Sequence, residues 1–259
     1  MSTLHLARLS ILALVVGADS AGTHPQAVNE KVREYIAARS AEFDKIPQPR
    51  RHELQKIAAY VRESARHGRP ARLTFVCTHN SRRSILCQVW GAAATAYFGV
   101  PGVETFSGGT EATAFNSRAV AVLRRAGFEI DEQTSGKNPH YAVRHRSDGP
   151  ALECFSKIYT DAPNPKADFC VVMTCTEADK RCPLVKGASL RIALPFDDPK
   201  ASDNTPRETA VYDERCRQVA RELLYVFSEI SPPLSHDKPV QSSRLEPGHA
   251  PNSPASSDR

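Results

Sequence analysis

The chain has 259 residues, of which 41% are hydrophobic and 24% are charged, and its formal net charge is +5. A chain of this length buries an ordinary core, so we expect one α/β domain with extensions. No dense block of Lys and Arg and no aromatic stripe accompanies the positive charge. This argues against a nucleic-acid partner and fits an anionic small substrate.

Residues 1–22 include Arg8 followed by the uncharged run LSILALVVGA, which is too short to span a bilayer. The run is compatible with a signal peptide, and equally with a mis-assigned start or a short buried helix. The seven cysteines are an odd number and do not form the pattern of a secreted disulfide framework. We therefore expect a cytoplasmic protein with no stable membrane span.

The rest of the chain divides into three parts. Residues 23–70 predict a helical extension, because 27–43 and 51–68 carry apolar residues at intervals of three and four around DKIPQP. Residues 71–231 alternate short apolar runs with helical patterns, which is typical of an α/β fold with a parallel central sheet flanked by helices. Residues 232–259 are rich in Pro, Ser and charge, and predict a disordered tail.

We expect strands at 71–77, 103–109, 167–175 and within 190–199, and helices at 84–99, 117–130 and 207–230. The second of these helices runs into a further strand. Residues 138–165 fit no clean period and predict an insertion of loops that could include a hairpin.

The stretch FVCTHNSRRS places Cys77 at the carboxyl end of the first strand, where ligands of such sheets collect. The loop after it leads into a helix, so its backbone N–H groups and the positive helix end form a concavity for a tetrahedral oxyanion. Cys77 would then be held as a thiolate nucleophile, with Arg83 binding two oxygens of the anion. The expected substrate-contacting residues are Thr78, His79, Asn80, Ser81, Arg82 and Ser84.

VCTHNSRRS resembles the phosphate loop of low-molecular-weight protein tyrosine phosphatases and thioredoxin-coupled arsenate reductases. FSGGTEATAFNSRAVAVLRRAGFEI and FDDP resemble later segments of the same family, so the likeness covers residues 71–231. His79 stands where a glycine is usual, and Arg82 where many members have a second cysteine. The resemblance implies that Asp198, before Pro199, is the general acid, with Asp197 as a less favoured substitute. Taken alone, DDP is more typical of a plain turn, and its pairing with Cys77 favours catalysis.

Cys175 and Cys182 separate the two branches of this family. The reductase resemblance implies that Cys77 attacks arsenate, Cys175 attacks Cys77 and releases arsenite, and Cys182 attacks Cys175, after which thioredoxin reduces the disulfide. No metal and no bound cofactor is expected. If the segment is helical, the two cysteines stand about 10.5 Å apart along the axis, beyond the roughly 7 Å limit between the Cα atoms of a disulfide, so oxidation must unwind it. Two unrelated buried thiols are the alternative.

Two further functions are compatible with the sequence. A low-molecular-weight tyrosine phosphatase, acting on phosphotyrosine or a small phosphate ester, would need only Cys77, Arg83 and Asp198. An anion-binding sensor is the third hypothesis, and a complete set of nucleophile and acid argues against it. The segment KASDNTP after the DDP motif has no aromatic pair to stack on a phosphotyrosine ring, which favours a small inorganic oxyanion. Four other cysteines are expected to be structural: Cys87, Cys154, Cys170 and Cys216.

Overall fold

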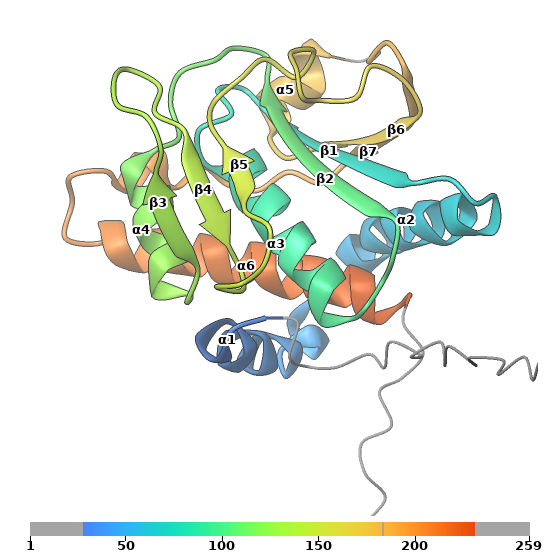
Figure 1. The fold of residues 1–259 in the computed structure, drawn as a ribbon, viewed down its shortest axis with the longest axis horizontal. Helices are drawn as coiled ribbons and strands as arrows, with labels where there is room; N and C mark the ends of the chain where they lie inside the picture. The colour runs from blue at the N-terminus through green and yellow to red at the C-terminus, as the bar shows by residue number, and fades with distance from the viewer. Residues whose placement is uncertain (1–27, 183, 231–259) are drawn as a thin grey trace, which may run out of the picture.

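A four-stranded parallel sheet forms the centre of the molecule, with the strand order β2-β1-β6-β7 (Figure 1). The computed structural model describes residues 28–182 and 184–230. The strands are β1 (Ala71–Cys77), β2 (Val103–Gly109), β6 (Phe169–Met173) and β7 (Ala188–Ala193), and every neighbouring pair is parallel. The predicted fold class is confirmed.

One face of this sheet carries most of the core. Leu73 and Phe75 of β1 point into a large apolar cluster beneath the helices, because alternate residues of a strand face opposite sides. The cluster is closed by α2 (Gln48–Arg66), α3 (Arg83–Tyr97) and α6 (Glu208–Ser228), with α1 (Glu30–Ser40) and α4 (Ser117–Arg125) packed on α6. In Figure 1 the long helix α6 runs below the sheet alongside α3.

The opposite face carries a smaller cluster. It contains Val76 and Cys77 of β1, residues of β6, and Ala178 of the short helix α5 (Thr176–Arg181). Ala178 is the only residue of α5 that is buried. Helix α5 therefore lies on this face next to the carboxyl ends of β1 and β6, where the predicted site lies.

A second, antiparallel sheet lies beside α4, with the order β3-β4-β5 (Figure 1). It comprises β3 (Glu129–Glu132), β4 (Tyr141–Arg144) and β5 (Leu152–Cys154). The strand expected after the second helix is therefore present, but it pairs with β4 and does not join the parallel sheet. Only Ile130 of β3 is buried, and a strand wetted on one face suits an antiparallel edge. The hairpin that the insertion could include is β4 and β5.

The predicted N-terminal helices are present and share the main core. Val32 and Ile36 of α1 and Leu54 and Ile57 of α2 belong to the same apolar cluster as the sheet and α6. A short 3-10 helix (Phe43–Lys45) joins α1 to α2. The predicted signal segment 1–22 and the predicted tail 232–259 lie outside the described residues.

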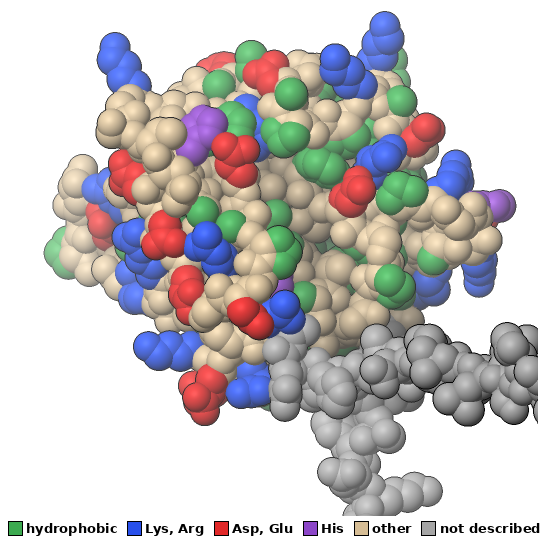
Figure 2. Space-filling view, in the orientation of Figure 1, with side chains coloured by type: hydrophobic (Ala, Val, Ile, Leu, Met, Phe, Trp, Pro, Cys, Tyr) green, Lys and Arg blue, Asp and Glu red, His purple; other side chains and the backbone are tan. Residues whose placement is uncertain are grey.

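Basic and acidic side chains are interspersed on the face shown in Figure 2, so that face carries no large field of one sign. Within residues 28–182 and 184–230, no helix has the length and apolar character needed to cross a membrane.

Candidate active site

The loop after β1 is braced by the end of β2. The carbonyl of Cys77 accepts from the N–H of Thr110 at 3.1 Å, and that of Thr78 accepts from Glu111 at 2.8 Å. Gly109 permits this approach, because a Cβ there would lie 2.2 Å from the Glu111 oxygen and 2.7 Å from that of Thr78. Gly109 lies within the motif FSGGTEATAF, but this role was not predicted from the sequence; a glycine at the end of a strand was the available signal.

The same loop presents hydrogen-bond donors that the protein itself does not use. Asn80 adopts a left-handed conformation with a φ of 44°, which turns the chain sharply between strand and helix. None of the backbone N–H groups from Thr78 to Arg82 donates a hydrogen bond to another described residue. Arg83 is 6% exposed, and its buried Nε also has no partner among those residues. Consecutive loop N–H groups and a buried guanidinium are suited to binding an oxyanion.

A directed chain of hydrogen bonds leads to the sulfur of Cys77. The N–H of Lys157 donates to Asn80 Oδ1 at 3.0 Å, which leaves the amide nitrogen of Asn80 to donate to Ser84 Oγ at 2.8 Å. The hydroxyl hydrogen of Ser84 is then free to point at Cys77 Sγ, 3.1 Å away. Asn80 and Ser84 therefore lie on a chain of hydrogen bonds that ends at the sulfur of the predicted nucleophile.

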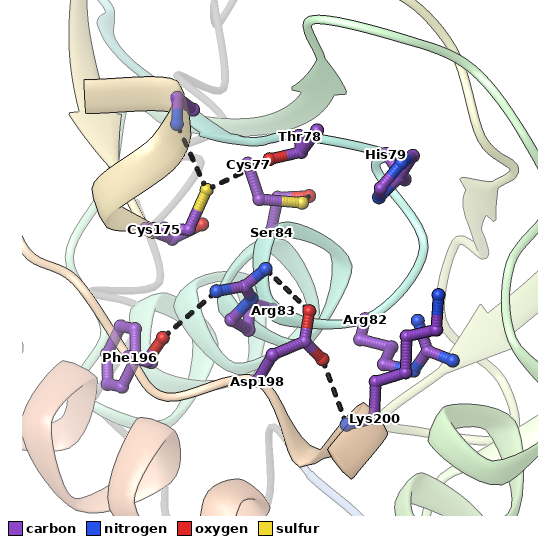
Figure 3. A network of polar contacts seen from close by, with 12 residues as sticks. Cys77, Thr78, His79, Arg82, Arg83, Ser84, Cys175, Phe196, Asp198 and Lys200 are labelled. Carbon is purple, nitrogen blue, oxygen red and sulfur yellow. Dashed lines mark hydrogen bonds and ion pairs between the residues drawn. The ribbon is translucent and has the colours of Figure 1, made fainter. Parts of the chain in front are cut away.

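Arg83 joins the loop to the predicted acid. Its Nη2 donates to Asp198 Oδ2 at 2.7 Å, and its Nη1 donates to the carbonyl of Phe196 at 3.1 Å (Figure 3). Asp198 also accepts from the N–H of Lys200 at 3.0 Å, and so caps the 3-10 helix η3 (Pro199–Ser202). By contrast, the side chain of Asp197 is 95% exposed and pairs outward with Arg215. Asp198 is therefore the carboxyl that faces the loop.

Arg83 and Asp198 border an open hollow of about 430 Å³. Charged and polar side chains dominate its lining, which suits a small charged substrate better than an aromatic ring. The lining residues are Thr78, His79, Arg83, Glu111, Thr176, Glu177, Arg181, Phe196, Asp197 and Asp198.

Two of the predicted substrate contacts have side chains that are engaged elsewhere. Arg82 donates to the hydroxyl of Tyr212 at 2.7 Å and to Asp203 at 3.1 Å, so only its backbone N–H remains to contact an anion. Burial, reinforced by the hydrogen bond to Asp203, raises the pKa of Tyr212 to about 12. His79 is partly exposed, with Nε2 3.5 Å from a carboxylate oxygen of Glu111.

Ser81 links the loop to helix α4 through its backbone. Its carbonyl accepts from the N–H of Asn116, the residue that caps α4. The bonds from Arg82 to Asp203 and Tyr212 were not predicted. Because Asp203 and Tyr212 come more than a hundred residues later, no local pattern could have indicated them.

A second thiol lies against the loop. β1 and β6 pair with Val76 opposite Met173, so Cys77, the last residue of β1, and Cys175, two residues after β6, lie at the carboxyl ends of neighbouring strands. Cys175 is fully buried, with Sγ 3.4 Å from the hydroxyl oxygen of Thr78, and it accepts from the N–H of Ala178 as the cap of α5. Figure 3 shows the sulfurs of Cys77 and Cys175 on the same side of the loop.

Cys182 stands at the opposite end of α5, where it is partly exposed and caps the helix. All seven cysteines are free, and the helical form of the segment between Cys175 and Cys182 agrees with the geometry considered from the sequence. The four thiols predicted to be structural are buried. Burial raises the pKa of Cys154 and Cys170 to about 12 and that of Cys216 to about 11. It also raises the pKa of Cys87.

No family model matches the chain. Curated relatives do: an arsenate reductase of Halalkalibacterium halodurans is 30% identical over 155 residues, which are 60% of this chain and 93% of the relative. The arsenate reductase of Brevibacillus brevis is 33% identical over 54% of this chain and 84% of the relative. The chain belongs to the arsenate reductase family. The predicted resemblance is confirmed, and the chain is an enzyme of this family.

Solved structures similar to this member of the arsenate reductase family include two phosphatases. A low-molecular-weight protein tyrosine phosphatase from T. tengcongensis has a TM-score of 0.42 at 18% identity, covering 61% of this chain and 99% of its own. The YwlE arginine phosphatase from Geobacillus stearothermophilus has a TM-score of 0.39 at 17% identity, covering 62% and 93%.

Proposed function

We propose that this protein reduces arsenate to arsenite through Cys77, Cys175 and Cys182, with thioredoxin as the electron donor. The observation that carries the proposal is the contact between Cys175 Sγ and the hydroxyl of Thr78, the residue that follows the nucleophile. A thiol at this position is needed to resolve an adduct on Cys77. Hydrolysis of a phosphate ester has no use for it.

The chemistry begins at the oxyanion loop. The Cys77 thiolate attacks the arsenic(V) of bound arsenate, an S–As bond forms, and one oxygen leaves as water with a proton from Asp198. Cys175, as a thiolate, then attacks the sulfur of Cys77. The S–As bond breaks, its electron pair stays on arsenic, and arsenite is released. Arsenic gains the two electrons that the two thiols lose, so the step is balanced.

The second half restores the nucleophile. Cys182, as a thiolate, attacks Cys175, which forms the Cys175–Cys182 disulfide and returns Cys77 as a thiolate. The dithiol of thioredoxin then reduces this disulfide. The partial exposure of Cys182 supports the last exchange, because a partner thiol has to reach it.

The contacts of Arg83 support the first step. In the unliganded loop Arg83 pairs with Asp198, and its Nε is buried without a partner among the described residues. An oxyanion that takes the guanidinium donors satisfies the orphaned Nε and releases the carboxyl of Asp198 toward the leaving oxygen. Negative charge that grows in the transition state would meet donors that are already in place.

The packing of α5 supports the second half. Cys175 and Cys182 cap opposite ends of the helix and are roughly 10.5 Å apart along its axis, too far for a disulfide. The helix must therefore unwind when the pair is oxidised. Because it buries only Ala178, unwinding would expose little apolar surface.

Thioredoxin-coupled arsenite production tests this proposal. Cys175→Ser and Cys182→Ser should each lose sustained arsenite production while keeping hydrolysis of 4-nitrophenyl phosphate, because neither thiol takes part in ester hydrolysis. Cys170→Ala is the matched control, since it removes a buried thiol from the strand that leads to Cys175, and it should keep both activities. Unchanged arsenite production in either serine variant would contradict the relay.

The alternative is a low-molecular-weight phosphatase that hydrolyses phosphotyrosine or a small phosphate ester. The observation in its favour is that Cys77, Arg83 and Asp198 lie together without any need for the other two thiols. Wild-type protein that hydrolyses phosphotyrosine at an enzymatic rate but releases no arsenite would replace the reductase with this function.

A further inference from the structure

An arginine of the N-terminal helices contacts the segment that carries Asp198. Arg50 lies in the first turn of α2, and its Nη1 donates to the carbonyl of Pro195 at 2.9 Å. Its guanidinium also lies over the ring of Phe196, 4.6 Å from the ring centre. Phe196 in turn offers its carbonyl to Arg83. Arg50 and Arg83 therefore hold the same short segment from two sides.

Arg50 is fixed in this position by a buried carboxylate. Its Nε lies 2.9 Å from Glu222 Oε2, and Glu222 on α6 is 2% exposed. Gln218 donates to the other oxygen of Glu222 at 2.9 Å. A buried carboxylate is costly unless it is paired and hydrogen-bonded, so the pair constrains where the Arg50 guanidinium can lie. The geometry of the Arg50 contacts is thus set by α6 and not by solvent.

We propose that Arg50 is a positioning residue for the acid of the active site. Through its contacts with Pro195 and Phe196 it fixes the position of the segment from which Asp198 reaches Arg83. Helix α2 therefore contributes to the geometry of the active site. The helix lies outside residues 71–231, the part whose sequence resembles the known family, so the proposed support for the acid comes from the N-terminal helical extension. The inference rests on the proposed role of Asp198 as proton donor.

The leaving group of the substrate separates acid positioning from general stability. Phenyl phosphate has a poor leaving group and depends strongly on a general acid, whereas 4-nitrophenyl phosphate has a good one and depends on it little. A misplaced Asp198 lowers the first rate selectively. A partly unfolded enzyme loses both rates in equal proportion.

The variants are chosen so that no buried charge is left unpaired. Arg50→Met is made in a Glu222→Gln background and compared with Glu222→Gln alone. Arg51→Met is the matched control, because the neighbouring Arg51 on α2 also donates to two carbonyls and lies over an aromatic ring, that of Tyr225, yet does not touch the acid segment.

We expect Arg50→Met to lower kcat for phenyl phosphate about tenfold, part of the roughly 10²- to 10⁴-fold that a general acid supplies, with less than about a twofold change for 4-nitrophenyl phosphate. Asp198→Asn should give the same selectivity with a larger loss. Equal losses on both esters, or the same selectivity in Arg51→Met, would overturn the inference.

Amide hydrogen exchange gives a second measurement that does not depend on the proposed chemistry. The N–H of Phe196 is bonded to the Thr174 carbonyl and that of Lys200 to Asp198. Both should exchange faster in the Arg50 variant and at the wild-type rate in Arg51→Met. If wild-type protein hydrolyses neither ester, the proposed chemistry fails, and exchange alone decides on Arg50: unchanged rates at both amides would refute its role.

Discussion

The loop after β1, residues 77–84, and the α5 segment, residues 175–182, both carry cysteines at the carboxyl ends of neighbouring strands. They differ in how many bonds and buried side chains attach them to the rest of the protein. The loop is hydrogen-bonded to Thr110 and Glu111 at the end of β2, to Lys157 through Asn80, and to α6 through Arg82. The α5 helix buries a single side chain.

The main bonds of α5 to the rest of the protein come from Arg191 of β7. Its guanidinium donates to the carbonyl of Cys182 at 3.1 Å and to the carbonyl and carboxylate of Asp179 at 2.7 and 2.5 Å. A rigid loop suits the step in which charge must be stabilised without rearrangement. A lightly held helix suits the step in which distant thiols must meet. The proposed mechanism would therefore use a tightly bonded loop for its first step and a lightly packed helix for its second.

The largest effect is expected when the proposed nucleophile of the loop 77–84 is removed. Cys77→Ser should abolish arsenite release and ester hydrolysis together, since both begin at this sulfur; loss of a catalytic nucleophile costs on the order of 10⁶ in kcat in a well-studied protease. Steady-state assays with arsenate and with 4-nitrophenyl phosphate measure it. Substantial activity left on either substrate would place the nucleophile elsewhere.

The second prediction compares Cys77 with the core thiols. Brief iodoacetamide treatment near pH 6.5 should label Cys77 first, and arsenate or phosphate should protect it. Cys154 and Cys170 are buried and have pKa values of about 12, so they stay protonated well above neutral pH and should remain unlabelled until the protein unfolds. Peptide mapping of the labelled sites is the measurement. Equal labelling that ignores the oxyanion would contradict the assignment of Cys77.

A smaller effect is expected from the hydroxyl that points at this sulfur. Ser84→Ala should slow alkylation of Cys77 and lower kcat for both substrates roughly 10- to 150-fold, because a hydrogen bond to a charged group contributes about 1.5–3 kcal/mol. Thr95→Ala, on the same helix with its hydroxyl donating to the Gly91 carbonyl, is the control and should leave both unchanged. A wild-type alkylation rate in Ser84→Ala would break the proposed chain of donors.

The smallest effect is expected when the bonds that hold helix α5 are weakened. Arg191→Met should loosen α5 by about 1 kcal/mol, as expected for a half-exposed ion pair, and speed formation of the Cys175–Cys182 disulfide roughly fivefold. Ester hydrolysis should stay constant. Arg72→Met, which removes a comparable pair with Glu104 between β1 and β2, should not change the disulfide rate. A slower or unchanged rate in Arg191→Met would mean that unwinding of α5 does not limit oxidation.

The fold was largely predictable because its signals are local. The strand from Ala71 to Cys77 and the helix after it follow from apolar periodicity and from the turn between them, and their bounds are confirmed within a residue or two. The partner of β3 was not predictable, since residues 129–132 alternate like any edge strand and the strand they pair with is set by tertiary packing.

The site divides in the same way. Cys77, Arg83 and Asp198 could be proposed from motifs, and the structure brings them together. The direction of the Arg82 side chain and the contact of Arg50 with Pro195 were not foreseeable, because both join residues more than a hundred positions apart. From sequence alone, an arginine on a helix is interpreted as a solvated charge, because its partner is not known.

The relay itself is tested most directly by trapping it. Cys182→Ser incubated with arsenate should accumulate a Cys77–Cys175 disulfide, seen by mass spectrometry of peptides under non-reducing conditions, because the thiol that would resolve it is gone. Wild-type protein should instead show Cys175–Cys182, which thioredoxin reduces. An arsenate-treated Cys182→Ser protein with Cys77 and Cys175 both still free would contradict arsenate reduction through these thiols.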